Sequence, residues 1–587
     1  MLYSPVVTEL LRILLSPIGP ALVLLLGAAI EMIVGRWLRR PHLVRGLALL
    51  VVGSASGLFL VLQFLNVVPT LGLPWQPLLQ TSINLFWNSD GWNNYLAGLI
   101  LLLGGLGVLL DRAQRDGVLH ARFYALQAMN LAILAASILF VTSGNLLTAL
   151  FAWVFLDFTV LLRTASEPAA GDDEQMLRTN EAQLLSLVGA LILLLGLLPA
   201  GATGPAQEFA RGVLPTETIV ALLLAAAIRT GAYPVHLWLL PRRRARVVLS
   251  DRLLGHMAPM LCGLWLFGWT YQLGGAALLT TPMAVLGLTA LLLASAVAAW
   301  TADDQPHHAT FVLVTAAGAA ALAGVLAHET GPAGIVWATT AFALGGGLWL
   351  VGNQVWLAWG WQAPVTVGAA ALAGVMFTPG FLAQPAYSTL LTRGPLYWPA
   401  AAVFVLAMGV QVAALLRSWS APEHAVNGNQ PQDFLVRLLI ACVALGLPLA
   451  VAGILPQFME TAIGIPNTIA PELGNPPSAV AAWPVWAIMA LPLLLGLALV
   501  QVRPRVWPYL GAWPNRLSRF SQLEWLFRAA VWGVDRVAAI SANGLGVVEG
   551  GADALIDSLL AVLGPAGTLL VPTLTGSEEL SPQNPPV

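Results

Sequence analysis

The side chains most able to do chemistry are ionisable residues that stand inside long apolar runs. Asp157 and Arg229 are the most interior of them, His256 begins another apolar run, and His307 and His308 stand at the start of a further one. A charged group is costly at membrane depth, so each of these residues is a candidate for holding or moving protons. The alternative for Asp157 and Arg229 is a buried ion pair that only pins two helices together.

Prolines interrupt two apolar runs that otherwise predict helices. Pro234 follows Arg229 by five residues, and Pro379-Gly380 interrupts a later run in the same way. A proline frees a helix carbonyl, which is tolerated at membrane depth only where protein or water satisfies it. Broken helices at matching places in two halves indicate an internal repeat and a conduction path. An ordinary proline kink is the alternative at either position.

The sequence lacks the motifs that bind cofactors and metals. No GxGxxG, P-loop, CxxC or HExxH pattern is present. Cys262 and Cys442 lie in apolar runs without partner spacing, as small buried hydrophobic residues do. We therefore expect no catalytic residue, no cofactor and no metal in this chain. The net charge of -2 gives no reason to expect a nucleic acid partner.

The elements that must position these residues are transmembrane helices. Of the 587 residues, 58% are hydrophobic and only 9% are charged, whereas soluble domains carry about 25% charged residues. The apolar runs are too long for strands and do not alternate. The sequence predicts an all-α integral membrane protein with about 14–16 transmembrane helices, since each span needs about 20 apolar residues. The candidate spans are 17–35, 46–66, 94–111, 122–141, 145–163, 180–200, 216–240, 253–273, 281–300, 308–327, 333–353, 362–382, 396–416, 436–455 and 481–501.

Arginine predicts the orientation of these spans. All 26 basic residues are arginines, and the chain contains no lysine. Arginines gather after the first, third, seventh and fifteenth spans, so they share one side of the membrane if the spans alternate. The positive-inside rule makes that side cytoplasmic and the N-terminus extracytoplasmic.

The chain changes character after Arg505. Residues 518–573 mix apolar residues at helical spacing with charged ones, which predicts an amphipathic tail along the cytoplasmic surface. The sequence leaves open whether 558–573 spans the membrane, because this short run contains Gly564, Pro565 and Gly567. The polar, proline-rich residues 574–587 predict a disordered end.

The segment AIRTGAYPVHLWLLP at residues 227–241 resembles a signature of the antiporter-like subunits of respiratory complex I. That family includes subunits of Mrp-type Na+/H+ antiporters and of membrane-bound hydrogenases. The lysine, proline, histidine and tryptophan of the family signature stand here as Arg229, Pro234, His236 and Trp238. Residues 145–153 are similar to the approach to the family's fifth-helix glutamate, and residues 378–384 to its broken twelfth helix. The tail resembles the lateral helix of the longest subunit type.

The resemblance implies how the chain is organised. It covers roughly residues 95–420 and implies an antiporter-like core at 122–420. Within this core we expect inverted five-helix repeats at 122–273 and 276–417. N-terminal transmembrane helices in 1–121 and C-terminal transmembrane helices in 436–501 flank the core.

The sequence departs from the family at the residues that carry protons there. Val154 stands where the family has its glutamate, with Asp157 one turn further on the same helix face. The family's lysines fall at Arg229, at Gln384 and near Leu344. Arginine effectively never releases its proton and glutamine does not titrate, so a lysine relay cannot operate here. The remaining candidates for a proton path are Asp157, Arg229, His236, His256, His307, His308 and Gln384.

The resemblance implies a proton-translocating, antiporter-like subunit of a complex I-like, NADH-quinone oxidoreductase-type assembly, with a degenerate proton path. We expect a multi-pass protein of a prokaryotic cell membrane, with lipid and other membrane and peripheral subunits as partners. Electron transfer would belong to those partner subunits. The alternatives are a stand-alone secondary transporter of a small solute and a non-conducting scaffold subunit. The sequence does not identify the ion, the direction of coupling or the electron donor.

Overall fold

A computed structural model gives the fold of the chain. The structure describes residues 5–38, 40–65, 68–74, 84–112, 114–115, 118–119, 122–166, 173–200, 209, 214–240, 248–302, 304–327, 333–417, 432–458, 483–510, 513–523, 525 and 536. The chain divides into a unit of Met1–Leu523 and a unit of Glu524–Val587, and every element below belongs to the first unit.

Helices make up nearly all of this unit. The α-helices are α1 (Pro5–Leu14), α2 (Gly19–Val34), α3 (Pro41–Leu65), α4 (Gly91–Leu110), α5 (Phe123–Val141), α6 (Leu146–Ser166), α7 (Asp173–Ala200), α8 (Thr216–Thr230), α9 (Ala258–Thr270), α10 (Ala276–Leu279), α11 (Pro282–Thr301), α12 (Gln305–Leu326), α13 (Ala333–Thr340), α14 (Gly346–Trp359), α15 (Ala363–Leu372), α16 (Pro379–Leu382), α17 (Gln384–Thr392), α18 (Trp398–Arg417), α19 (Gln432–Ile454), α23 (Trp483–Val506) and α24 (Trp513–Ser521). The π-helices are η3 (Asp251–Met257), η4 (Tyr271–Gly275) and η6 (Ala341–Gly345), and the 3-10 helices are η2 (Leu237–Leu239), η7 (Pro395–Tyr397) and η10 (Trp507–Leu510).

The membrane fold follows from the length and composition of these helices. Within the described residues, 10 helical segments are long and apolar enough to cross a membrane. Shorter apolar helices lie at Gly19–Val34, Leu185–Pro199 and Ala363–Leu372. Each predicted span contains at least one helix, so the prediction of an all-α integral membrane protein is confirmed.

Short hairpins occupy two of the loops. Strands β1 (Thr70–Pro74) and β2 (Asn84–Asn88) pair antiparallel, with Thr70 opposite Asn88 and Pro74 opposite Asn84. The second hairpin joins β3 (Gln114–Arg115) to β4 (Val118–Leu119). Just after β2, the Asp90 side chain accepts a hydrogen bond from the Asn93 N–H at 2.8 Å, and this cap fixes where α4 begins.

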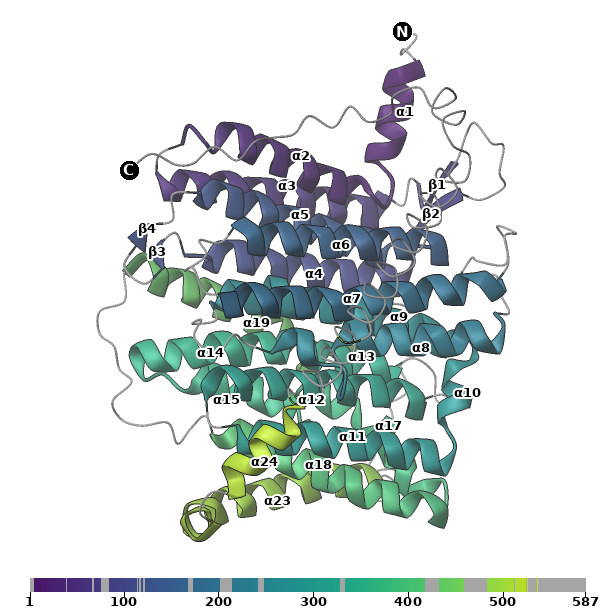
Figure 1. Ribbon diagram of the computed structural model, residues 1–587, viewed down its shortest axis with the longest axis vertical. Coiled ribbons are helices and arrows are strands. Elements are labelled where there is room, and N and C mark those ends of the chain that lie inside the picture. Colours follow the sequence, from purple (N-terminus) through teal and green to yellow (C-terminus); the bar gives the residue numbers. More distant parts are fainter. Residues whose placement is uncertain are drawn as a thin grey trace, which may run out of the picture. The chain divides into compact units, whose positions relative to one another are not determined.

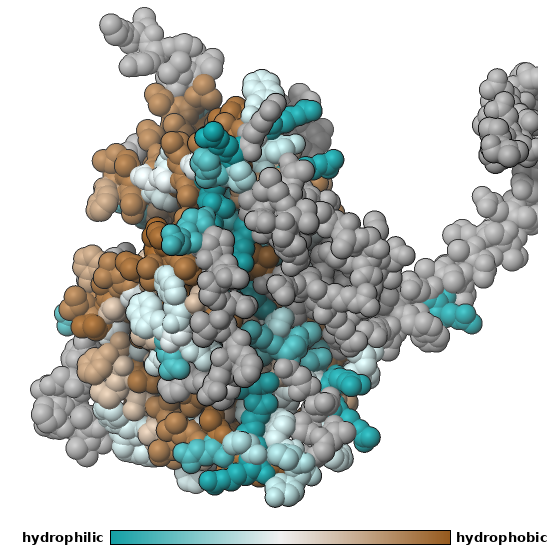
Figure 2. Space-filling view, turned by 90° about the vertical axis from the view of Figure 1, so that its left-hand side faces the viewer, coloured by the Kyte–Doolittle hydropathy of each residue, from teal (hydrophilic) through white to brown (hydrophobic). Residues whose placement is uncertain are grey.

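In Figure 1 most helices of the first unit run across the view, roughly parallel or antiparallel to one another, and they are stacked along the vertical long axis. Helix α2 packs against α3 and α5, and α11, α18 and α23 pack together further along this axis. Exposed apolar side chains cover the outer faces of α3, α19 and α23, as expected of surfaces in contact with lipid. Figure 2 views the end at which β3 and β4 lie, where hydrophilic residues form a band beside a hydrophobic flank.

Breaks interrupt two helices where proline predicted them. Helix α8 ends at Gly231, whose φ of 66° is a left-handed conformation that glycine adopts readily, and the chain continues through Pro234 to η2. Helix α15 ends before Gly374 and Phe377, with φ values of 70° and 62°, and Pro379 then starts α16. The predicted helix breaks at Pro234 and Pro379 are therefore confirmed. Whether the two predicted repeats superpose by inversion stays a prediction.

Hydrogen bonds join the helix formed by η3, α9 and η4 to α12 at both ends. At one end, Arg252 Nη2 donates to the Pro306 carbonyl at 2.7 Å and Nη1 donates to Thr310 Oγ1 at 3.2 Å. At the other end, the Tyr271 hydroxyl donates to the Ala321 carbonyl at 2.9 Å. These bonds join the first predicted repeat directly to the second.

Candidate functional site

Asp157 of α6 and Arg229 of α8 form an ion pair inside the first predicted repeat. Arg229 Nη1 lies 2.7 Å from Asp157 Oδ1, and the two side chains are only 4% and 18% exposed. Arg229 stands in the last turn of α8, just before the break at Gly231, so the charge lies beside the non-helical segment. The predicted contact is confirmed. It places an intramembrane acid beside a base that cannot release its proton.

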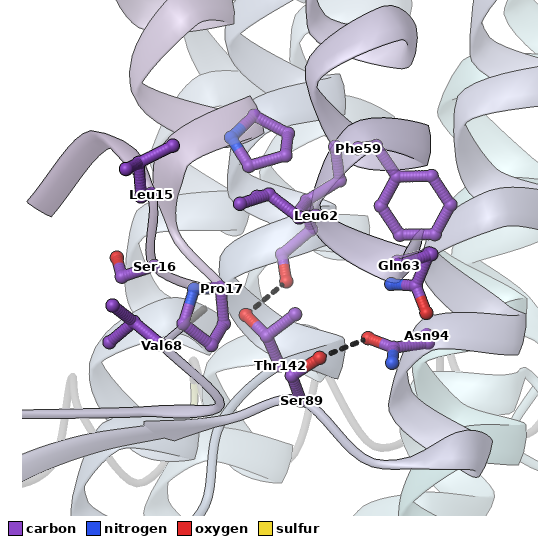
Figure 3. Close-up of a pocket in the computed structure, with 13 residues that line it drawn as sticks. Leu15, Ser16, Pro17, Phe59, Leu62, Gln63, Val68, Ser89, Asn94 and Thr142 are labelled. Carbon is purple, nitrogen blue, oxygen red and sulfur yellow. Dashed lines mark hydrogen bonds between the residues drawn. The ribbon is translucent and has the colours of Figure 1, made fainter. Parts of the chain in front are cut away.

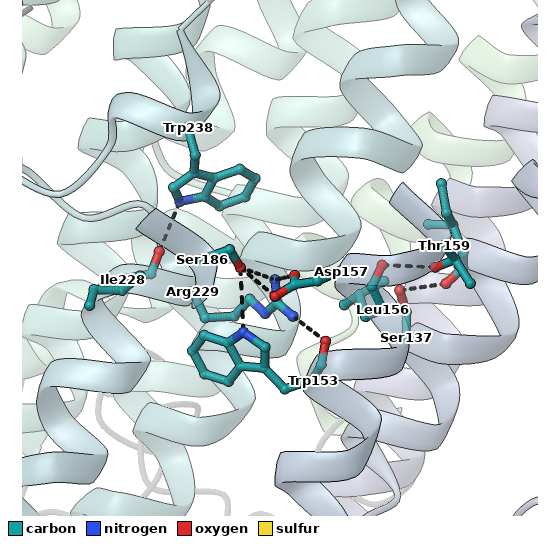
Figure 4. Close-up of polar contacts among 10 residues, drawn as sticks. Ser137, Trp153, Leu156, Asp157, Thr159, Ser186, Ile228, Arg229 and Trp238 are labelled. Atoms are coloured by element: carbon teal, nitrogen blue, oxygen red, sulfur yellow. Dashed lines mark hydrogen bonds and ion pairs between the residues drawn. The ribbon is translucent and has the colours of Figure 1, made fainter. Parts of the chain in front are cut away.

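Neighbouring side chains hold this pair from several directions (Figure 4). Ser186 Oγ of α7 donates to Asp157 Oδ2 at 2.7 Å, and Arg229 Nη1 lies 3.3 Å from the same hydroxyl. Arg229 Nη2 donates to the Trp153 carbonyl at 3.2 Å, and its guanidinium lies 4.3 Å from the centre of the Trp153 ring. A cation over a tryptophan face is stabilised by the ring electrons. The contacts fix the guanidinium in one place.

A residue that follows the break donates a hydrogen bond back to the last turn of α8. The Trp238 indole N–H donates to the Ile228 carbonyl at 2.8 Å, in addition to the Gly231 N–H, which caps the same carbonyl at 3.0 Å (Figure 4). The signature tryptophan therefore stabilises the end of the helix that carries Arg229.

His236 is fully buried beyond the break. Its ring stacks on Tyr233 at 5.0 Å and tilts against Phe311 of α12 at 4.9 Å between centroids. The Tyr233 hydroxyl donates to the Ser521 carbonyl at 3.0 Å, so the end of α24 lies against this segment.

The other predicted histidines lie apart from the ion pair. The His256 ring lies in η3 and meets Trp238 edge-on at 6.4 Å. His308 Nδ1 is 2.9 Å from the Ala299 carbonyl, and His307 Nδ1 contacts the Asp304 carboxylate. Burial raises the pKa of Asp304, but its hydrogen bond and charge interaction with His307 outweigh burial and leave that pKa below its usual value.

Uncharged side chains stand where the second repeat would carry the family's lysines. Gln384 begins α17 beside the break, and a Cβ on Gly374 would lie 2.2 Å from its Nε2. The φ of 70° at Gly374, which side chains other than glycine rarely adopt, explains why glycine occupies the turn. Leu344 lies in η6 and is buried. Neither side chain can carry a proton.

A buried polar cluster around Asp111 was not among the predicted site residues. The Asp111 carboxylate accepts from Asn130 Nδ2 at 2.9 Å and Ser250 Oγ at 3.0 Å. Arg163 Nε donates to Asn130 Oδ1 at 2.6 Å, and Arg163 also pairs with Asp251. We name these five residues the Asp111 cluster. In the sequence Asp111, Arg163, Ser250 and Asp251 stand at or near span ends, where polar groups usually face water, and Asn130 lies inside the fourth span. Only packing reveals that Asp111, Asn130 and Ser250 are fully buried.

The predicted tail is described only at its start. Helix α24 ends at Ser521, and Leu523 has a φ of 57°, so the chain turns there instead of continuing one helix from 518. Nearly all of the predicted tail at 518–573 and the whole predicted end at 574–587 lie outside the described residues. The Arg242–Arg246 loop, on which the predicted orientation depends, also lies outside them.

Solved structures of membrane complexes share this fold. The chain is similar to a chain of the Mrp complex from Dietzia sp. DQ12-45-1b, with a TM-score of 0.68 and 16% identity over 94% of this chain, and it spans 63% of that chain's length. A chain of respiratory complex I from Thermus thermophilus matches at a TM-score of 0.59 and 18% identity, over 82% of this chain and 99% of that one. A chain of the membrane-bound sulfane sulfur reductase, an archaeal respiratory membrane complex, matches at 0.58 and 17%, over 74% and 75%. These matches show that the chain shares its fold with chains of an Mrp complex and of respiratory membrane complexes, as the resemblance implied.

Sequence comparison adds little to this result. A family model described as aminoglycoside 3-N-acetyltransferase matches residues 539–587, a small part of the chain outside the described residues. No curated protein sequence matches the chain.

Proposed function

We propose that this chain is an antiporter-like, proton-translocating membrane subunit of a complex I-like assembly in a prokaryotic cell membrane. The observation that carries the proposal is the Asp157–Arg229 pair, buried beside the break that ends α8. Intramembrane ionisable residues beside broken helices are typical of ion pathways. The shared fold with chains of respiratory complexes supports the same role.

Within this proposal Asp157 carries the proton, and Arg229 holds the Asp157 side chain in position. Arginine keeps its proton, so residue 229 contributes a fixed positive charge. Ser186 donates to the free oxygen of Asp157 and offers a second polar group beside it. A proton reaching Asp157 would weaken the ion pair, and the contacts to Trp153 would still hold Arg229 in place.

A non-conducting scaffold is the second candidate, because the second repeat lacks a charge at Gln384 and Leu344. Proton uptake into vesicles that contain the whole assembly distinguishes the two. If the first repeat conducts, Asp157→Asn combined with Arg229→Gln abolishes uptake through this subunit. Glu217→Gln, at the exposed start of α8, is the matched control and should leave uptake unchanged. Full uptake by a folded double variant would establish the scaffold role.

The N-terminus is proposed to be extracytoplasmic and the arginine-rich loops cytoplasmic. The arginine asymmetry between alternate loops supports this orientation. Other membrane and peripheral subunits are the proposed partners and would carry out the electron transfer.

A further inference from the structure

A buried carboxyl lies outside the antiporter-like core, in helix α2. Glu31 is fully buried and continues the stripe of Leu24, Gly27 and Ala28 that α2 turns toward its neighbours. The adjacent Ile30 is 48% exposed, on the face that lipid would cover. Glu31 therefore points into the helix bundle, away from lipid and water.

Neither carboxylate oxygen of Glu31 has a hydrogen-bond partner in the described part of the chain. On the helices that pack against α2, the charged or titratable side chains at this end are His42 and Arg45 of α3 and Tyr124 of α5, and the exposed Arg122 caps the start of α5. His42 is exposed, and Arg45 donates to the Asp111 carbonyl at 3.0 Å and lies over the Phe123 ring. Among the described residues, no hydrogen bond or ion pair joins a cation to Glu31, and a buried carboxyl in this setting is far less costly as the neutral acid.

The way in which α2 and α5 lie side by side places Glu31 near the Asp111 cluster. A Cβ on Gly35 would lie 2.8 Å from the Tyr124 Cβ, so Glu31, one turn back along α2, stands level with the next turn of the antiparallel α5. That turn carries Gln127, which is fully buried and donates to Asp111 Oδ2 at 3.4 Å. The side-chain oxygen of Gln127, Oε1, accepts no hydrogen bond from the described residues. It can therefore accept a hydrogen bond from an acid proton or a water.

The Asp111 cluster leads from this position to the surface. Arg437 Nη1 donates to the Asp111 carbonyl at 3.2 Å, and its Nη2 pairs with Asp433 at 2.8 Å. The Asp433 side chain is 66% exposed. A line of polar groups therefore runs from the level of Glu31 to water at this end of the bundle.

We propose that the Glu31 carboxyl is a proton-binding site at the α2–α5 interface, and that its proton exchanges along water molecules held by hydrogen bonds to Gln127 and the Asp111 cluster. The site is separate from the Asp157–Arg229 pair and does not depend on it. Its ligand is a proton, carried by those water molecules while the amide and guanidinium groups only hold them in place. Glutamate at this position keeps a neutral, exchangeable acid inside the membrane.

Infrared difference spectra of the membrane-reconstituted protein test the proton-binding site. The carbonyl band of a protonated carboxylic acid should be present in the wild type and absent from Glu31→Gln. Glu217→Gln, which changes an exposed glutamate, should keep the band. Thermal stability gives a second readout, because glutamine resembles the neutral acid and should leave Tm unchanged. An unchanged band in Glu31→Gln, or a marked loss of Tm that indicates a stranded cation such as Arg45, would overturn the site.

The rate at which the band shifts on transfer to D2O tests the route. Gln127→Leu keeps the side-chain volume but removes the amide, so it should slow the shift several-fold without removing the band. Val141→Leu, at the far end of the same helix, is the matched control. A rate in Gln127→Leu equal to that of the wild type would exclude the proposed route.

The N-terminal helices also enclose a small cavity at their other end. It offers about 20 Å³ to the centre of a water molecule and is lined by residues that include Ser16, Gln63 and Asn94 (Figure 3). This space is enough for about one or two waters. It belongs to the ends of α3 and α4 opposite the Asp111 cluster, so it takes no part in the proposed exchange route.

Discussion

At the residue scale, the chain holds a buried charge pair in its first predicted repeat, and it does so without lysine. Guanidinium and ammonium groups both pair with carboxylates, but only the ammonium group loses its proton readily when buried. The contacts of Arg229 to Trp153 and Ser186 use the planar shape of the guanidinium. Arginine at this position therefore cannot transfer a proton, but it holds its partners in a fixed geometry.

Removing Asp157 alone should destabilise the protein, because it strands the buried Arg229 charge. We expect Asp157→Asn to lower the free energy of unfolding by about 3–5 kcal/mol, the usual cost of breaking a buried ion pair. Adding Arg229→Gln should recover much of the loss. Thermal unfolding in detergent measures both variants. A double variant as unstable as the single one would contradict the pairing.

Replacing Arg229 by lysine should also weaken the site. Lysine keeps the charge but cannot reach Asp157 and the Trp153 carbonyl together, so one charged hydrogen bond is lost, worth about 1.5–3 kcal/mol. The same unfolding assay measures it, with Arg12→Lys at an exposed pair as control. Equal stability of Arg229→Lys and the wild type would show that the planar contacts do not matter.

At the element scale, the sequence predicted the helices and both breaks because length, hydropathy and proline act locally. It also predicted that Asp157 and Arg229 meet, since two isolated charges on neighbouring apolar helices have few other partners. It could not predict the Asp111 cluster, because the meeting of Asn130 and Ser250 with Asp111 depends on how α4, α5 and η3 pack together. Nor could it place the turn at Leu523, a left-handed conformation that leucine rarely adopts.

The contact between α24 and the α8 break should contribute to stability. Tyr233→Phe removes the hydroxyl that donates to the Ser521 carbonyl and should cost about 1 kcal/mol. Limited proteolysis should then cleave after α24 more rapidly. Tyr509→Phe is the control, because that side chain is 90% exposed. Unchanged proteolysis of Tyr233→Phe would show that the contact does not hold the tail.

Loop accessibility tests the orientation of the elements. The chain has two cysteines, Cys262 and Cys442, and both are buried, so the background of thiol labelling should be low. In intact cells a membrane-impermeant thiol reagent should label Thr70→Cys, in the exposed β1 strand, and should not label Ala245→Cys, in the arginine-rich loop. The reverse pattern would invert the topology.

At the scale of the whole molecule, the predicted role requires other subunits. Purification in mild detergent should recover this chain together with other membrane and peripheral chains. A protein that is stable and active alone would instead favour a stand-alone secondary transporter. This chain spans 63% of the matched chain of the Mrp complex, so the two differ in length. Identifying the chains that co-purify is therefore the most informative measurement.

The hydrogen bonds between the η3–α9–η4 helix and α12 have a mechanical consequence. Arg252 joins one end of this helix contact to Pro306, and Tyr271 joins the other end to Ala321. Sliding or opening of one half against the other would break these hydrogen bonds, so we expect the two halves to move together. An ion that crosses this protein would then pass by local motion of side chains and water.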